Sequence, residues 1–239
     1  MTASDPPAIR LKNVALTLGG KEFRFDCELP AGVITAITGP SGSGKSTLLN
    51  LIAGFETPDA GRISIGDRNV TNLHPSERPV SLVFQDNNLF AHLDLFTNIG
   101  LGISPSLQLS SMDRDRIGDA LERVGLGGYE KRRPGTLSGG ERQRAAFARA
   151  LVRKRPVLLL DEPFAALDPS LRQTMSALLH ELHRETGNTI AIVTHDANEV
   201  RRLADHALFI NDGEVALQAE TAAFLMRRDV PGLADFLKA

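Results

Sequence analysis

The stretch GPSGSGKST at residues 39–47 constrains the fold of this chain more than any other feature of its sequence. It follows the apolar, β-branched run GVITAIT (32–38) and leads into KSTLLNLIAGF (45–55), whose spacing predicts a helix ending near Gly54. A glycine-rich loop between a buried strand and a helix presents backbone N–H groups and the positive end of the helix dipole. The stretch matches G-x-x-x-x-G-K-[ST] in full and therefore predicts a phosphate-binding loop.

The residue types in this loop each have a chemical reason. Gly39, Gly42 and Gly44 let the backbone wrap around phosphates without Cβ clashes. Lys45 places a positive charge on the outer phosphates, and the hydroxyl of Ser46 is the expected Mg²⁺ ligand. The predicted nucleotide-binding residues of the loop are Gly39, Pro40, Ser41, Gly42, Ser43, Gly44, Lys45, Ser46 and Thr47.

Two adjacent carboxylates stand at the end of a second apolar run, VLLLDEP (157–163). The run is typical of a strand buried on both faces. Because side chains alternate along a strand, Asp161 and Glu162 face different directions and have different roles. We expect Asp161 to approach Mg²⁺, commonly through water, and Glu162 to act as the general base on the attacking water.

Strands and helices alternate along most of the chain, which predicts an α/β fold with a largely parallel sheet. TIAIVTHD (189–196) is a further buried strand, residues 170–186 carry an apolar helical stripe, and ALFI-NDG-EVAL (207–217) predicts a hairpin. The pattern changes between Phe84 and Pro156, where helical spacing replaces strand signals.

We therefore expect one domain over residues 8–239 with a helical subdomain inserted in its sheet. The predicted core covers 8–84 and 157–239, the helical subdomain covers about 85–156, and residues 1–7 are an expected disordered N-terminus.

Composition narrows the classes of partner. The formal net charge of −2 argues against nucleic acid, and we interpret the basic run at 131–155 as solvated helix faces. A single cysteine, Cys27, excludes an intramolecular disulfide. The N-terminal sequence carries no signal-peptide pattern and no window is apolar enough to span a bilayer, so any membrane role is expected to come through a partner.

The stretch LSGGERQR (137–144), together with GPSGSGKST and LLLDEP, resembles the ATP-binding cassette (ABC) ATPases over nearly the whole chain. The resemblance implies a P-loop NTPase (RecA-like) α/β core with a small antiparallel β subdomain and an inserted helical subdomain. It implies that Gln85 in VFQD touches Mg²⁺ and water, that His195 in VTHD contacts the γ-phosphate, and that Asp168 in ALDP lies in the D-loop.

The resemblance also implies a homodimer that forms with ATP and Mg²⁺. In this family two domains pack head to tail, so that Ser138, Gly139 and Gly140 of one subunit contact the γ-phosphate held by Lys45 of the other. An aromatic residue upstream of the P-loop usually stacks on adenine. The position that we align with it is Leu18, which offers apolar contact without a π-face, and Phe23 is the alternative.

Three kinds of cassette protein differ in their chain layout. Chromosome-organising and DNA-repair cassettes carry a long insertion, for which Gln85 and Ser138 are too close in the sequence. Translation-associated cassettes fuse two copies, whereas this chain has one P-loop and one signature. A transporter subunit remains, and a separate ATPase polypeptide favours an importer.

The segment RPVSLVFQDNNLFAHLDLFTNIGLGISPSLQLS (78–110) resembles the ATP-binding subunits of bacterial thiamine importers. This resemblance implies uptake of thiamine or phosphorylated thiamine, and another small solute (an ion, a polyamine, sulfate or iron) is the alternative. It implies a peripheral location at the cytoplasmic face of the bacterial inner membrane. The implied partners are integral membrane permease subunits and, indirectly, a periplasmic solute-binding protein.

Overall fold

A computed structural model describes residues 6–238 of the chain. The residues group into two compact units. The first comprises the described residues of Met1–Val80, Pro156–Asp161 and His183–Ala239, and the second comprises Ser81–Arg155 and Glu162–Leu182.

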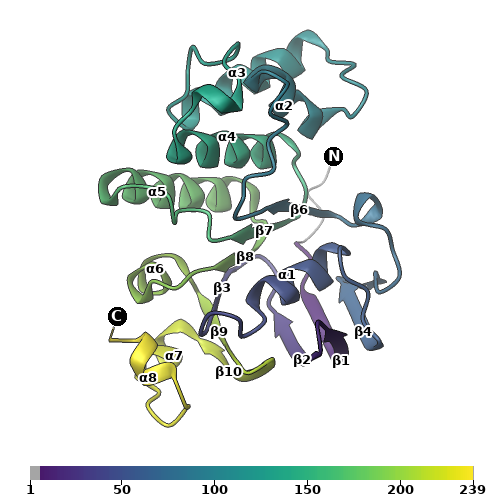
Figure 1. Cartoon of the computed structure of the whole chain (residues 1–239), viewed down its shortest axis with the longest axis vertical. Helices are drawn as coiled ribbons and strands as arrows, with labels where there is room; N and C mark the ends of the chain where they lie inside the picture. The colour runs from purple at the N-terminus through teal and green to yellow at the C-terminus, as the bar shows by residue number, and fades with distance from the viewer. Residues whose placement is uncertain (1–5, 239) are drawn as a thin grey trace. The chain divides into compact units, whose positions relative to one another are not determined.

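The first unit is built on a β-sheet (Figure 1). Its strands are β1 (Ile9–Leu18), β2 (Lys21–Leu29), β3 (Ile34–Thr38), β4 (Ala60–Ile65), β5 (Arg68–Asn69), β7 (Val157–Asp161), β8 (Thr189–Val193), β9 (His206–Asn211) and β10 (Glu214–Glu220). Neighbouring strands follow the order β5-β4-β1-β2-β10-β9-β3-β8-β7. A further strand, β6 (Val80–Val83), spans the boundary between the units.

The sheet has a parallel part and an antiparallel part. Strands β9, β3, β8 and β7 pair in parallel, and every residue of β3 and β8 is buried. Strands β1, β2, β4 and β5 pair antiparallel, and buried residues alternate with exposed ones along β2. The parallel part confirms the predicted α/β core, and the antiparallel part is the β subdomain implied by the resemblance.

Helices and turns of the first unit begin and end where the sequence carries the corresponding signals. The helices are α1 (Lys45–Ala53), α6 (Ala197–Leu203), α7 (Thr221–Met226) and α8 (Leu233–Phe236), with a 3-10 turn at Pro75–Glu77. Helix α1 ends at Gly54, which has a left-handed φ of 88°. The β9–β10 turn contains Asp212 (φ 47°) and Gly213 (φ 86°), so the predicted hairpin is present.

The second unit is helical. Its helices are α2 (Leu95–Ile103), α3 (Ser111–Arg123), α4 (Gly139–Val152) and most of α5 (Pro169–Thr186), with a 3-10 turn at Pro134–Thr136. Helices α2, α3 and α4 pack against one another (Figure 1). Asp94, Ser110 and Ser138 cap the first three helices by accepting a hydrogen bond from the backbone N–H of the third residue beyond. Helix α2 carries no charged residue and was not predicted from the sequence.

The limits of these units differ from the boundaries drawn on the sequence. The segment 162–182, assigned to the core on sequence grounds, groups with the helical unit. Most of the expected disordered N-terminus lies outside the described residues. Pro7, however, is placed, and its carbonyl oxygen accepts a hydrogen bond of 2.7 Å from the Thr189 hydroxyl. None of the helices within 6–238 combines the length and the apolar character that crossing a membrane requires.

Candidate functional site

The P-loop occupies the turn between β3 and α1, as the sequence predicts. Lys45, the first residue of α1, is 8% exposed, and its Nζ donates hydrogen bonds to the carbonyl oxygens of Gly39 (2.9 Å) and Pro40 (2.8 Å). These bonds hold the ammonium group inside the curve of the loop. The helix has no side-chain N-cap and no acidic residue in its first turn, so its positive end stays available to an anion.

The glycines of the loop shape a cradle that fits a polyphosphate. A Cβ at Gly39 would lie 2.0 Å from the Ile210 carbonyl oxygen, and one at Gly44 would lie 2.8 Å from the Phe23 ring. Gly42 has a left-handed φ of 72° and open space where its Cβ would stand. The Ser43 hydroxyl is buried and has no hydrogen-bond partner among residues 6–238. The loop residues with exposed side chains are Pro40, Ser41 and Ser46, and Thr47 is half-buried.

Parallel pairing brings further predicted residues to the same edge of the sheet. Val193 on β8 pairs with Ile37 on β3 and with Asp161 on β7. The P-loop after β3, His195 after β8 and the carboxylate that ends β7 therefore lie at the carboxyl ends of adjacent strands. Ligands of parallel α/β sheets bind at this edge. The side chain of His195 is exposed there.

A buried carboxylate supports the His195 segment. Glu199 is 5% exposed, and its carboxylate accepts a hydrogen bond of 2.5 Å from the Thr194 hydroxyl. The Thr194 oxygen in turn accepts one from the Asp196 backbone N–H at 3.1 Å. These bonds define the backbone path on both sides of His195.

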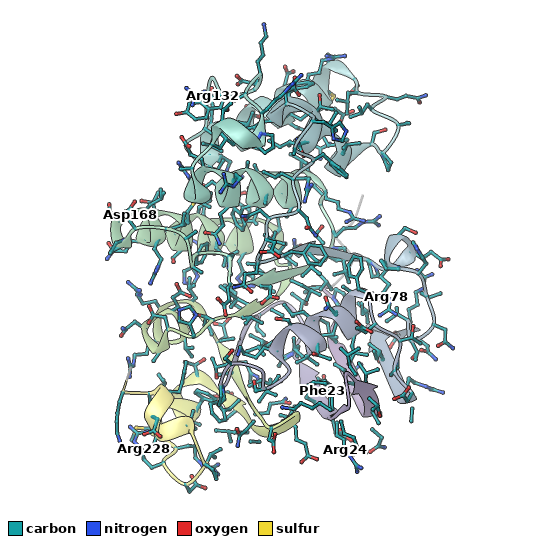
Figure 2. The ribbon with its side chains drawn as sticks, in the orientation of Figure 1. Phe23, Arg24, Arg78, Arg132, Asp168 and Arg228 are labelled. Carbon is teal, nitrogen blue, oxygen red and sulfur yellow. The ribbon has the colours of Figure 1, made fainter. Side chains whose placement is uncertain are left out.

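The β1–β2 hairpin meets the P-loop through residues that differ in exposure. Phe23 (labelled in Figure 2) is 6% exposed, and its ring packs against Gly44. The centroids of the Phe23 and Phe25 rings are 6.3 Å apart. Lys21 donates a hydrogen bond of 3.1 Å to the Gly42 carbonyl oxygen and stands over the Phe23 ring. Leu18, at the end of β1, is 42% exposed.

The signature segment opens α4 in the second unit. The backbone N–H of Ser138 donates to the Glu141 carboxylate at 2.7 Å, and the Glu141 N–H donates to the Ser138 hydroxyl oxygen at 3.2 Å. The hydrogen bond from Ser138 holds the pKa of Glu141 below its ordinary value. Ser138 is exposed, and Gly139 and Gly140 in the first turn are half-buried. The segment thus presents a capped helix N-terminus.

The segment after β7 carries Glu162 and Asp168 in the same unit as the signature. Glu162 is half-buried and has a left-handed φ of 47°. Asp168 (labelled in Figure 2) is exposed, and its carboxylate accepts a hydrogen bond of 2.9 Å from the Leu171 N–H in the first turn of α5. Asp168 therefore acts as a cap of this helix within its own chain.

Gln85 lies in the exposed loop that follows β6. Arg149 of α4 supports this loop by donating to the carbonyl oxygens of Asn88 (2.8 Å) and Asn87 (3.2 Å). Asn98 of α2 is fully buried, and its amide bonds both the N–H and the carbonyl of Phe90. The loop backbone is therefore held by hydrogen bonds at residues 87–88 and again at Phe90.

Several of these supporting residues were missed from the sequence. Arg149 belongs to the basic run that we interpreted as solvated helix faces, yet burial lowers the pKa of its guanidinium. Two further arginines of the same run also donate to backbone carbonyls. Arg142 donates to that of Leu137, and Arg144 donates to those of Val124 and Gly125. The sequence signal that could have identified such a residue is a polar side chain among the apolar residues of a helix, as for Asn98 in LFTNIGLGI.

The predicted site residues divide between the units. The first unit carries the P-loop, Asp161, His195 and Leu18, and the second carries Gln85, Glu162, Asp168 and residues 138–140. Within residues 6–238 no group of His, Cys, Asp or Glu side chains is arranged to hold a metal ion alone. The predicted Mg²⁺ ligands Ser46, Gln85 and Asp161 supply hydroxyl, amide and carboxylate oxygens, the donor chemistry that this ion prefers.

Comparison with known proteins agrees with this geometry. The family model described as ABC transporter matches residues 23–165. The chain is 54% identical to the "Thiamine import ATP-binding protein ThiQ" of Rhizobium meliloti (strain 1021) over 96% of this chain and 97% of that protein. It is 52% identical to the protein of the same name from Brucella suis biovar 1 (strain 1330), covering 99% and 98%.

The fold also matches a solved structure. The structure titled "Dimeric structure of a post-hydrolysis state of the ATP-binding cassette MJ0796 bound to ADP and Pi" superposes with a TM-score of 0.81 at 32% identity. The match covers 89% of this chain and 98% of that chain.

Proposed function

Because this chain belongs to the ABC transporter family and is an ATPase of that family, we propose that it energises the import of thiamine or phosphorylated thiamine. The observation that carries the proposal is its 54% identity, over nearly the full length of both chains, to a protein named for thiamine import. The resemblance of segment 78–110 to thiamine-importer subunits supports the same substrate class.

The P-loop binds the phosphates of ATP in this proposal. Backbone N–H groups of the loop and the positive end of α1 face the phosphates, and the Lys45 ammonium neutralises the outer ones. Ser46, Gln85 and Asp161 are the residues that would hold Mg²⁺, which would supply charge neutralisation to the phosphates. Leu18 covers the adenine by apolar contact.

Glu162 is the general base. Its carboxylate orients the attacking water and takes its proton while the water oxygen bonds to the γ-phosphorus and the bond to ADP breaks. His195, which follows the carboxyl end of β8, contacts the γ-phosphate in this proposal, and Asp168 belongs to the D-loop that the family resemblance implies.

The active assembly in this proposal is a homodimer, which the dimeric state of the MJ0796 structures supports. Its subunits pack head to tail, as the resemblance to the family implies. Ser138, Gly139 and Gly140 of one subunit reach the γ-phosphate bound by its partner. The hydroxyl oxygen of Ser138 accepts the capping bond from the Glu141 N–H, and the hydroxyl also interacts with the Glu141 carboxylate, from which its O–H would turn to donate to a phosphate oxygen. The dimer binds permease subunits at the cytoplasmic face of the inner membrane, and a periplasmic solute-binding protein delivers the solute to them.

An uptake assay tests the substrate. Deleting this chain from its host should abolish accumulation of radiolabelled thiamine, and the wild-type chain should restore it. Lys45→Ala should fail to restore uptake because the charge on the outer phosphates is lost. Normal thiamine uptake in the deletion strain, with loss of a different solute such as iron or a polyamine, would overturn the substrate assignment.

A second experiment tests the chemical role of Glu162. Glu162→Gln should bind ATP normally but hydrolyse it roughly 10²–10⁴-fold more slowly, the usual contribution of a positioned general base. Since ATP then persists, this variant should elute as an ATP-bound dimer on size exclusion. Wild-type turnover by the variant would remove Glu162 from this role.

A further inference from the structure

A buried amide joins the signature helix to the segment that carries Glu162. Gln143 lies in the second turn of α4 and is 3% exposed. Its Nε2 donates a hydrogen bond of 2.9 Å to the Glu162 carbonyl oxygen, and its Oε1 accepts one of 3.2 Å from the Ala166 N–H. Only this orientation of the amide places the donor on the carbonyl and the acceptor on the N–H. One side chain therefore holds both ends of the turn 162–166.

The turn needs such support because its first residue is strained. Glu162 has a φ of 47°, a left-handed value that side chains with a Cβ rarely adopt. Strained backbone persists only where the surroundings determine it, and it gathers at functional sites. The Ala165 N–H also donates to the Glu162 carbonyl at 3.3 Å, so that carbonyl is bonded from within the turn and from α4.

The signature glycines pack against the same turn. A Cβ at Gly140 would lie 3.1 Å from Cδ2 of Leu167 and 3.4 Å from the Ala166 carbonyl oxygen. The start of α4 and the segment after Glu162 therefore fit closely, and the Gln143 amide is the polar connection across this contact.

We propose that Gln143 is a positioning residue for ATP hydrolysis, which fixes the backbone of Glu162 so that its carboxylate faces the attacking water. The inference rests on the proposed role of Glu162 as general base. Gln143 contacts Glu162 through the backbone carbonyl of Glu162. Loss of the Gln143 amide therefore redirects the Glu162 carboxylate, while the residues of the P-loop are unchanged. Because Gln143 stands one turn beyond the signature glycines, it also ties the base to the surface that contacts the partner's nucleotide.

Substitutions at Gln143 separate its two hydrogen bonds. Gln143→Leu removes both, whereas Gln143→Glu keeps an acceptor for the Ala166 N–H and sets an oxygen against the Glu162 carbonyl. Both variants should lower kcat about tenfold to a hundredfold, since a shift of about 1 Å in a catalytic group can cost that much. The KM and Kd for ATP should stay at the wild-type values. Gln143→Glu, nearly the size of the native residue, carries the test if Gln143→Leu does not fold.

Gln218 is a control for an amide that bonds backbone groups. Its amide donates to the Glu28 carbonyl at 2.7 Å and accepts from the Glu28 N–H at 3.2 Å on a strand of the first unit, and unlike Gln143 it is exposed. Gln218→Leu should leave kcat unchanged.

A double variant distinguishes positioning from a general structural effect. In the Glu162→Gln background, Gln143→Leu should cause no further loss of hydrolysis, because its effect acts through the carboxylate that is already absent. The double variant should still form the ATP-bound dimer on size exclusion, which shows that the signature segment is intact.

Other outcomes overturn the inference. A folded Gln143 variant with wild-type kcat contradicts it, and so does a loss that multiplies with that of Glu162→Gln or appears mainly in KM. Wild-type turnover by Glu162→Gln itself would instead overturn the proposed role of Glu162 as general base, so the failures of the two proposals are distinguishable.

Discussion

The contrast between Leu18 and Phe23 is the sharpest residue-scale question at the nucleotide site. Leu18 is 42% exposed at the end of β1, whereas the Phe23 ring is 6% exposed and packs against Gly44 and Phe25. An exposed side chain can cover a base, while a ring buried under the P-loop supports the loop from below. The exposures therefore favour Leu18 for the adenine contact.

Substitutions at these two positions have different expected outcomes. Leu18→Tyr should tighten ATP binding by about tenfold at most, because base stacking on an aromatic ring is worth roughly 1–3 kcal/mol and leucine already provides part of the contact. Phe23→Ala should mainly lower the free energy of unfolding, by about 3–5 kcal/mol, through the cavity that it leaves. Nucleotide titration and urea denaturation measure the two effects. Weaker ATP binding by a fully folded Phe23→Ala would reverse the assignment.

At the scale of elements, Arg78 (labelled in Figure 2) closes the C-terminal end of α1. Its side chain is 1% exposed and donates to the carbonyls of Leu51 and Ile52 at 2.7 and 2.9 Å, and to those of Thr71 and Leu73 at 3.0 Å. A Cβ at Gly54 would lie 2.5 Å from its Nε, so that glycine also makes room for the guanidinium. Burial lowers the pKa of Arg78.

Arg78→Met should therefore destabilise the fold by about 2–4 kcal/mol, because the buried carbonyl oxygens lose their charged hydrogen-bond donor and remain without a partner. Urea denaturation measures this loss. Arg68→Met is the matched control: Arg68 donates one exposed hydrogen bond, to the Glu77 carbonyl, and its loss should cost less than about 0.5 kcal/mol. Equal stability of the two variants would contradict the assigned role of Arg78.

The loop after Gln85 presents apolar side chains at Leu89 and Phe90. Phe90 is 47% exposed and Leu89 is half-buried, while Asn98 holds the backbone of Phe90 from below. We expect this apolar surface to contact the permease, so Leu89→Ser with Phe90→Ser should uncouple transport from hydrolysis. ATPase activity of the isolated chain should stay near the wild-type value. If the melting temperature falls and coupling survives, the two residues are core rather than contact surface.

At the scale of the whole molecule, the signature and the P-loop belong to different compact units of one chain. In the proposed dimer each nucleotide is held by Lys45 of one subunit and by Ser138 of the other. Placing Ser138→Arg and Lys45→Ala in the same subunit, opposite a wild-type partner, then damages both composite sites. Placing them in opposite subunits leaves one site complete.

ATPase assays on heterodimers separated by two affinity tags test this arrangement. We expect near-background activity for the first heterodimer and about half of the wild-type activity for the second. The reverse ranking would mean that the signature acts on the nucleotide of its own subunit. Melting curves control for the lost helix cap at Ser138, which costs about 1 kcal/mol.

The parts of the site that depend on consecutive residues could be predicted from the sequence. The P-loop, the α1 helix ending at Gly54, the β9–β10 turn and the strand before Asp161 all follow from neighbouring residues, and each occurs where it was expected. Glycine, proline and periodicity act over a few positions, so their signals survive in a sequence without coordinates.

Contacts between distant segments were decided by the tertiary structure alone. The pairing of Gln143 with the Glu162 carbonyl, the donation of Arg78 to the end of α1 and the grouping of 162–182 with the helical unit have no local signature. In each of the two hydrogen bonds a buried polar side chain bonds a group that lies far away in the sequence, and burial of that side chain without a partner would be costly. Consecutive residues therefore specify which chemistry this protein carries, and the packing of distant segments specifies which side chains hold that chemistry in place.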